Sequence, residues 1–213
     1  ISQGVDYQRF NVKTDKNDAR FKRIRQFKRP LLGFLGTMHF IFDYDLLNHI
    51  AEKKPEWPVM LIGKKGLKVA EDITRFQNLI RRKNVFYMGE LSDELATIYM
   101  QKVDVCLMPM KKIEFNRCAG HLKIWDYMAL GHPIVAIDQG IKFDCDEFIK
   151  VANTKEGFIE AIGEALEEDR QNDKSLVEAR KNIARENSWE SRIDQMMKII
   201  ELHLDNRNYI RNP

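Results

Sequence analysis

The 213-residue chain has little cysteine, little proline and no long hydrophobic run. Its three cysteines, Cys106, Cys118 and Cys145, are too few and too scattered for a disulfide scaffold, and they indicate a reducing, cytoplasmic compartment. No apolar run approaches the roughly 18 residues that a membrane-spanning helix needs, so we expect no integral membrane segment. The chain begins at Ile1 without a basic and apolar leader, and we therefore expect it to be a piece of a longer protein.

Net charge is also small, because 35 basic residues face 32 acidic ones and leave +3. With 44% hydrophobic and 31% charged residues, the composition is globular and excludes a disordered, collagen-like or coiled-coil chain. Residues 13–29 nevertheless carry eight basic and two acidic side chains. This segment is either a solvated connector or a surface for an anionic membrane or nucleic acid. Nothing else resembles a nucleic-acid-binding module, so no nucleic-acid partner is expected.

Short apolar runs alternate with helical patterns along most of the chain. Buried strands are predicted at 31–35, 59–62, 85–88, 103–108, 133–137 and 148–151. Helices are expected between them, and three more follow with starts at Asn153, Asp173 and Ser188. Such alternation favours an α/β fold, a Rossmann-like doubly wound parallel sheet of about six strands with extra C-terminal helices.

Ligands of such sheets bind at the carboxyl ends of the strands. The first three strands each end in glycine, at Gly36, Gly63 and Gly89, where backbone can approach a ligand closely. Neither G-x-G-x-x-G nor G-x-x-x-x-G-K-[ST] is present, so we expect no dinucleotide cofactor and no P-loop chemistry. The two D-x-D triplets, at 43–45 and 144–146, are interpreted as structural, and no metal is expected.

The segment from Met108 to Asp138 is the most informative. A strand stops at a proline, and a polar loop leads into a helix expected over about 120–130. The start of such a helix offers unpaired amides to an anion. Lys123 in its first turn could add positive charge beside a diphosphate, and Asp126, three residues on, could accept hydrogen bonds from a ribose diol.

Residues 122–135, LKIWDYMALGHPIV, resemble the signature lKxxEYxAxGxPVV of GT-B glycosyltransferases of the family-4-like group. It lies in their C-terminal, nucleotide-sugar-binding domain. Further segments agree in order and spacing: SQGVD at 2–6 with Phe10, LGFLG at 32–36, LIG at 61–63, NVFYMG at 84–89, DVCLMP at 104–109 and ENSWE at 186–190 with Arg192. The resemblance covers nearly the whole chain and implies one half of a GT-B fold, without its acceptor-binding domain.

The resemblance implies a role for several residues. The diphosphate of the donor would lie against the helix start, where the Lys123 ammonium would stabilise the leaving group. Asp126 would bind the ribose hydroxyls, and the loop at Met88 and Gly89 would face the nucleobase. The other expected donor contacts are Gly36, Thr37, Gly120, His121 and Leu122, with His39, Lys64, Asn116 and Arg117 as secondary candidates.

Two departures leave the stereochemical outcome open. Retaining relatives carry Glu-x7-Glu here, whereas Cys118 stands eight residues before Asp126. They also carry an Arg or Lys pair after the first strand, where this chain has Thr37, Met38 and His39. No general base for the acceptor hydroxyl is evident, so the catalytic residue stays unassigned.

We therefore predict three parts: residues 1–29 as the end of an interdomain linker and a basic connector, 30–187 as the donor-binding domain, and 188–213 as a helix that braces this domain or a missing N-terminal one. The predicted function is transfer of a hexose-type sugar from a nucleoside diphosphate, UDP by preference, to a glycan or lipid-linked acceptor. The fragment alone is expected to be inactive, and the whole protein to be cytoplasmic or peripheral at the inner membrane face. The alternatives are a non-catalytic interaction module and a sugar-nucleotide epimerase of the same architecture.

Overall fold

The computed structural model describes residues 3–10, 24, 27–118, 122–140, 142, 145–171 and 173–211. Its centre is a parallel sheet of six strands in the order β3-β2-β1-β4-β5-β6. The strands are β1 (Leu32–Leu35), β2 (Val59–Ile62), β3 (Val85–Gly89), β4 (Val105–Met108), β5 (Ile134–Ile137) and β6 (Ile149–Ala152). All six lie within two residues of the predicted ranges, which confirms the doubly wound α/β fold. The order reverses between β1 and β4, and this is the switch point where such sheets bind ligands.

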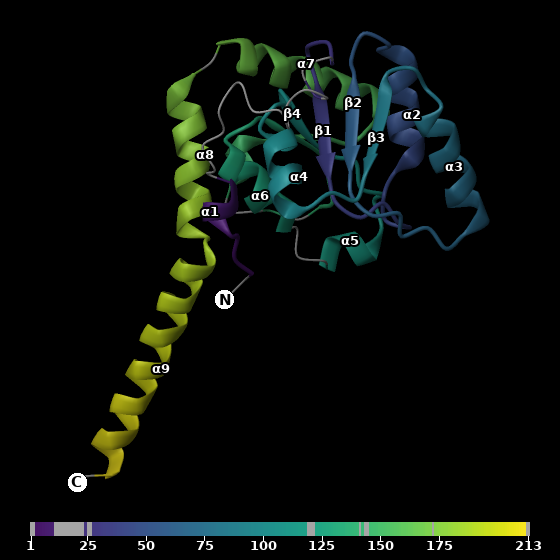
Figure 1. The fold of residues 1–213 in the computed structure, drawn as a ribbon. Coiled ribbons are helices and arrows are strands. Elements are labelled where there is room, and N and C mark those ends of the chain that lie inside the picture. The colour runs from purple at the N-terminus through teal and green to yellow at the C-terminus, as the bar shows by residue number, and fades with distance from the viewer. Residues whose placement is uncertain are drawn as a thin grey trace.

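Helices cover both faces of the sheet (Figure 1) and create two separate hydrophobic cores. On one face lie α2 (Tyr44–Lys53), α3 (Ala70–Ile80) and α7 (Lys155–Gln171). On the other lie α1 (Tyr7–Phe10), α4 (Asp93–Met100), α6 (Leu122–Leu130) and α8 (Lys174–Glu186). The central strands are apolar throughout because neither of their faces meets water.

Side-chain caps fix where several helices begin. The Asp43 carboxylate accepts a hydrogen bond from the amide of Leu46 at 2.8 Å, so the first D-x-D triplet is a helix start. The start expected at Asn153 is wrong by one residue. The cap is Thr154, whose hydroxyl accepts from the Gly157 amide at 3.0 Å. Either residue type can cap, and only the backbone path decides which one does.

The loop expected before α6 contains a short helix, α5 (Glu114–Cys118). Asn116, a secondary donor candidate, is buried there, and its amide donates to the carbonyls of Lys111 at 2.7 Å and Ile41 at 3.3 Å. These bonds tie the segment to the loop that follows β1, because a buried amide must find acceptors. A five-residue helix gives too little periodicity to be recognised in sequence.

The first described residues belong to the domain body. Val5 is 2% exposed; its amide donates to the carbonyl of Asn187 at 3.0 Å, and its carbonyl accepts from the Trp189 amide at 3.1 Å. Helix α1 packs against α4 and α6, with Phe10 buried. Most of the basic segment 13–29 lies outside the described residues.

The last helix, α9 (Trp189–Arg211), extends away from the domain (Figure 1). Six large apolar side chains recur along it at the spacing of one helix face and are all exposed: Trp189, Ile193, Met196, Met197, Ile200 and Leu204. Among the described residues no helix combines the length and apolar character that crossing a bilayer requires. An amphipathic stripe of this kind normally packs against another element.

Candidate functional site

The carboxyl ends of β1, β2 and β3 meet through their terminal glycines. The Gly36 amide donates to the carbonyl of Ile62 at 2.8 Å, and the Gly63 amide donates to the carbonyl of Gly89 at 2.8 Å. A Cβ atom on Gly63 would lie 2.2 Å from the carbonyl oxygen of Gly36. Only glycine allows the strands to end this close together.

Lys123 reaches this edge from the first turn of α6. A Cβ atom on Gly36 would lie 2.2 Å from Lys123 Cε and 2.3 Å from its Nζ, so the side chain crosses directly over the bare backbone at the end of β1. Its Nζ lies 5.8 Å from the centroid of the Phe34 ring. Tyr127 holds α6 in place, since its hydroxyl accepts from the Leu35 amide at 3.0 Å and donates to the Leu107 carbonyl at 3.3 Å.

Among the described residues, the Lys123 ammonium forms no ion pair, and the carboxylate that acts on its pKa is that of Asp126. Burial lowers the pKa of Lys123, an effect that the more distant Asp126 carboxylate partly offsets. Burial and then this same ammonium lower the pKa of His39. A bound anion would restore the favourable interactions that Lys123 has lost with water.

Asp126 lies one turn further along α6. Burial raises its pKa to about 6, while the Arg9 guanidinium and then the Lys123 ammonium lower it. Arg9 comes from α1 and pairs with Asp93 at the start of α4, at 3.1 Å. Sequence reasoning missed Arg9, because only the packing of α1 against α6 brings these two residues, far apart in the chain, near each other.

The remaining predicted residues are placed as follows. Met88 is buried and Gly89 has a φ of +79° at the end of β3. Thr37, Lys64 and Arg117 are exposed, and Leu122 is 41% exposed. The loops after β1 and β2 are joined by a hydrogen bond from the Met38 amide to the Lys64 carbonyl at 3.0 Å. Gly120 and His121 lie outside the described residues.

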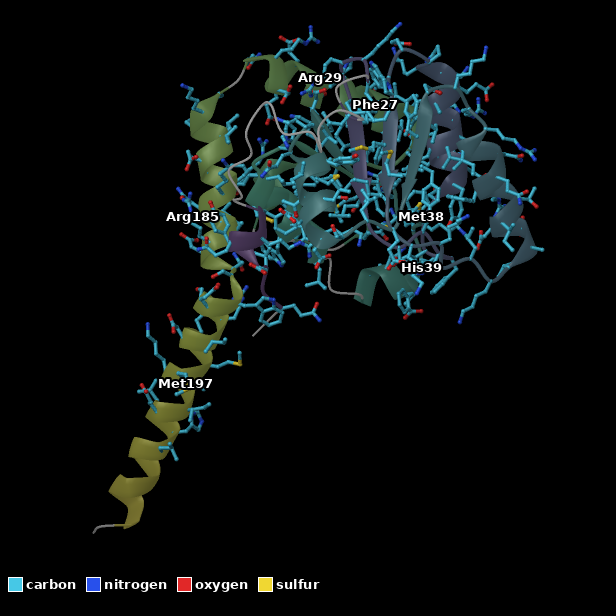
Figure 2. The ribbon with its side chains drawn as sticks, viewed as in Figure 1. Phe27, Arg29, Met38, His39, Arg185 and Met197 are labelled. Carbon is cyan, nitrogen blue, oxygen red and sulfur yellow. The ribbon has the colours of Figure 1, made fainter. Side chains whose placement is uncertain are left out.

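The two ends of the parallel strands carry different residues. Met38 and His39 lie at the end toward which the strand arrows point, and Phe27 and Arg29 lie at the opposite end (Figure 2). Over the described ranges, no three His, Cys, Asp or Glu side chains are grouped so as to hold a metal ion. The Lys123 ammonium can bind an anionic group, and the Asp126 carboxylate can accept hydrogen bonds from hydroxyl groups.

Three comparisons relate the chain to known proteins. A protein-family model described as "Glycosyl transferases group 1" matches residues 29–168, more than half of the chain. A Bacillus subtilis (strain 168) protein, TuaH, named as a candidate glycosyltransferase of teichuronic acid biosynthesis, is 26% identical over 203 residues. That alignment covers 93% of this chain and 49% of TuaH, so the chain spans about half the length of this relative.

Two solved structures share the fold. Anabaena HepE in complex with UDP-glucose has a TM-score of 0.68 at 17% identity, over 93% of this chain and 56% of HepE. The C-terminal domain of LpcC from Francisella tularensis, a glycosyl transferase group 1 family protein, has a TM-score of 0.51 at 16% identity. It is matched over 95% of its own length and 88% of this chain. The chain thus has the architecture of one domain of these proteins.

Proposed function

The chain belongs to the glycosyl transferases group 1 family, and from this premise we propose that it is the donor-binding half of a GT-B glycosyltransferase that uses a UDP-sugar. The proposed reaction moves a hexose-type sugar from the nucleoside diphosphate to a glycan or lipid-linked acceptor. Similarity to a structure that holds UDP-glucose and to a candidate glycosyltransferase of teichuronic acid biosynthesis supports this choice.

The observation that carries the proposal is the Lys123 ammonium above Gly36, which forms no ion pair within the described ranges. Glycosyl transfer leaves negative charge on the departing diphosphate as its bond to the anomeric carbon breaks. An ammonium that is already desolvated and positioned stabilises that charge without reorganising, which is how electrostatic catalysis acts. The first turn of α6, where Leu122 is 41% exposed, adds the positive end of a helix dipole.

The nucleoside would extend from Lys123 toward Asp126 and the end of β3. In the proposed complex, the Asp126 carboxylate accepts hydrogen bonds from the ribose hydroxyls, and Met88 and Gly89 face the base. In this proposal Gly36, Thr37 and Leu122 complete the diphosphate site, together with Gly120 and His121, which lie outside the described residues. His39, Lys64 and Arg117 are secondary contacts at its rim.

The rest of the active site would come from a domain outside this chain. The described residues include no evident base for the acceptor hydroxyl, and we propose that the preceding half of the full-length protein supplies it together with acceptor binding. Residues 1–29 would connect the preceding half to this domain, since Val5 forms hydrogen bonds with Asn187 and Trp189 where α9 begins.

The exposed apolar stripe of α9 would brace that preceding half. We place the protein in the cytoplasm, where a lipid-linked acceptor would bring it to the inner membrane face.

Nucleotide titration tests the proposal directly. Calorimetric titration of UDP, GDP and ADP into the protein should give saturable binding of UDP, tighter than that of the other two. Tighter binding of GDP or ADP would mean that the donor carries a different nucleobase. If none of the three nucleotides bound, in the full-length protein as well, a donor-binding role would be contradicted.

The Asp126 pKa predicts a pH dependence of donor binding. Because burial raises this pKa to about 6, the carboxylate is largely protonated at pH 5 and ionised at pH 7. The ionised form accepts stronger, charge-assisted hydrogen bonds from the two ribose hydroxyls, so affinity should rise with pH and be about tenfold lower at pH 5 than at pH 7. UDP-glucose is the suitable probe, because both of its phosphoryl groups are esterified and neither titrates in this range.

Asp126→Asn provides the control for that titration. The amide keeps the shape of the side chain but cannot ionise, so its affinity for UDP-glucose should be lower at pH 7 and nearly independent of pH. A variant that retained the full pH dependence would assign the titration to another group, and Asp126 would lose its proposed role.

A further inference from the structure

A cavity of about 660 Å³ lies at the amino ends of β2 and β3, at the end of the sheet opposite to the proposed donor site. Figure 2 shows Phe27 and Arg29 at this end of the sheet, and Met38 and His39 at the other. The cavity lining combines two phenylalanine rings with three basic side chains and one carboxylate: Phe27, Phe86, Lys28, Arg29, Lys83 and Glu56. Its chemistry is therefore both aromatic and cationic.

The two rings form an apolar wall that is fixed to the domain. The centroids of Phe27 and Phe86 are 4.5 Å apart, and both rings are half-buried against the hydrophobic core. Ile24, three residues before Phe27, is 4% exposed in the same core. Ile24 and Phe27 thus face the domain, and they hold the neighbouring Lys28 in the cavity lining.

Positive charge is in excess around the cavity. The Glu56 carboxylate already pairs with Lys54 at 3.9 Å, and the Arg29 guanidinium pairs with a carboxylate outside the lining. Within the described ranges, neither Lys28 nor Lys83 forms an ion pair, and both are exposed. A concave surface whose free charges share one sign concentrates the electrostatic field, so the cavity favours an anionic ligand.

The sequence before Lys28 adds more positive charge. Lys28 and Arg29 are the last of the eight basic residues in segment 13–29, which has only two acidic ones. Clusters of about four to eight lysines and arginines are typical of surfaces that bind anionic lipids. The segment and the cavity together fit that pattern.

The direction of α9 leaves this face of the domain accessible. The helix extends toward the end to which the strand arrows point (Figure 1), and the preceding half of the protein, which we place against it, would lie on the same side. The amino ends of the strands therefore stay available for another contact. A bilayer at these ends would leave the proposed donor site open to nucleotide sugars.

A phospholipid suits both parts of the lining. Its phosphate can contact the ammonium groups, and its apolar portion can contact the phenylalanine rings, as in other proteins that bind at the surface of a bilayer. We propose that the surface formed by Phe27, Lys28, Lys83 and Phe86 docks onto an anionic phospholipid bilayer, with both ammonium groups at the lipid phosphates. This contact goes beyond the proposed function and needs no bound donor.

Co-sedimentation of the full-length protein with lipid vesicles tests the proposal. The protein should bind vesicles made of an equimolar mixture of phosphatidylcholine and phosphatidylglycerol, and it should bind vesicles of phosphatidylcholine alone much less. Binding should weaken as salt is added, because ions screen the contacts between exposed charges. Equal binding to both kinds of vesicle, or saturable binding of inorganic phosphate without any binding of vesicles, would overturn the proposal.

Variants connect the binding to this surface. Lys28→Gln and Lys83→Gln should each weaken binding to the mixed vesicles about fivefold, and the double variant about 25-fold. Lys68→Gln is the matched control and should bind as the unchanged protein does, because Lys68 is exposed in the loop after β2, at the opposite end of the sheet. Vesicle binding that is indifferent to Lys28→Gln and Lys83→Gln, or that falls equally in Lys68→Gln, would overturn the assignment. UDP titration of the same variants tests the donor site separately.

Discussion

Lys123→Ala is expected to lower donor turnover in the full-length enzyme by about 10²–10³-fold, the usual loss when one preorganised charge-stabilising donor is removed. The ammonium has no close carboxylate partner among the described residues and is already desolvated, so little of its interaction with a diphosphate is spent elsewhere. UDP binding by calorimetry should weaken in parallel, because both the ground state and the leaving group carry the diphosphate charge.

Two further variants separate charge from position. Gly36→Ala keeps the ammonium but places a Cβ 2.3 Å from Nζ, which must then move away, so UDP binding should also fall. Lys83→Ala removes an exposed lysine that precedes β3 at the opposite edge of the sheet, and it should leave UDP binding unchanged. If UDP binding weakened equally in the Lys83 and Lys123 variants, it would depend on the overall charge of the protein and not on the position of Lys123.

Gly63→Ala is expected to be the most destabilising of the glycine substitutions at this edge, lowering the free energy of unfolding by about 2–4 kcal/mol. Gly63 has a φ of +136°, which side chains rarely adopt, and its added Cβ would lie 2.2 Å from the backbone oxygen of Gly36. Backbone in a sheet cannot rotate away as a lysine side chain can. Urea unfolding followed by circular dichroism measures the change.

Gly89→Ala is the matched control at the same edge. Its φ is +79°, but nothing lies within 4 Å of the added Cβ, so only the cost of a left-handed alanine remains, about 1–2 kcal/mol. A Gly63 variant as stable as the Gly89 variant would mean that the strand ends separate easily, and the tight glycine junction would then not be a rigid part of the site.

The sequence by itself determined the local elements of this protein. Alternating apolar runs located all six strands, and the periodic segment up to Leu130 located α6 with Lys123 in its first turn. Such patterns are reliable because burial on one or both faces of an element repeats within a few residues. The motif spacing also indicated the family that the comparisons establish.

Only the tertiary structure decided which of these residues meet. Strand order brings Gly36 under the Lys123 side chain, and helix packing brings Arg9 close to Asp126. The same packing buries the side-chain oxygen of Gln139 without a hydrogen-bond donor among the residues that the structure describes. These relations depend on contacts between residues far apart in the chain, which periodicity does not encode. The pKa shifts of Lys123 and Asp126 were also decided by the tertiary structure, because desolvation depends on everything that surrounds a group in space.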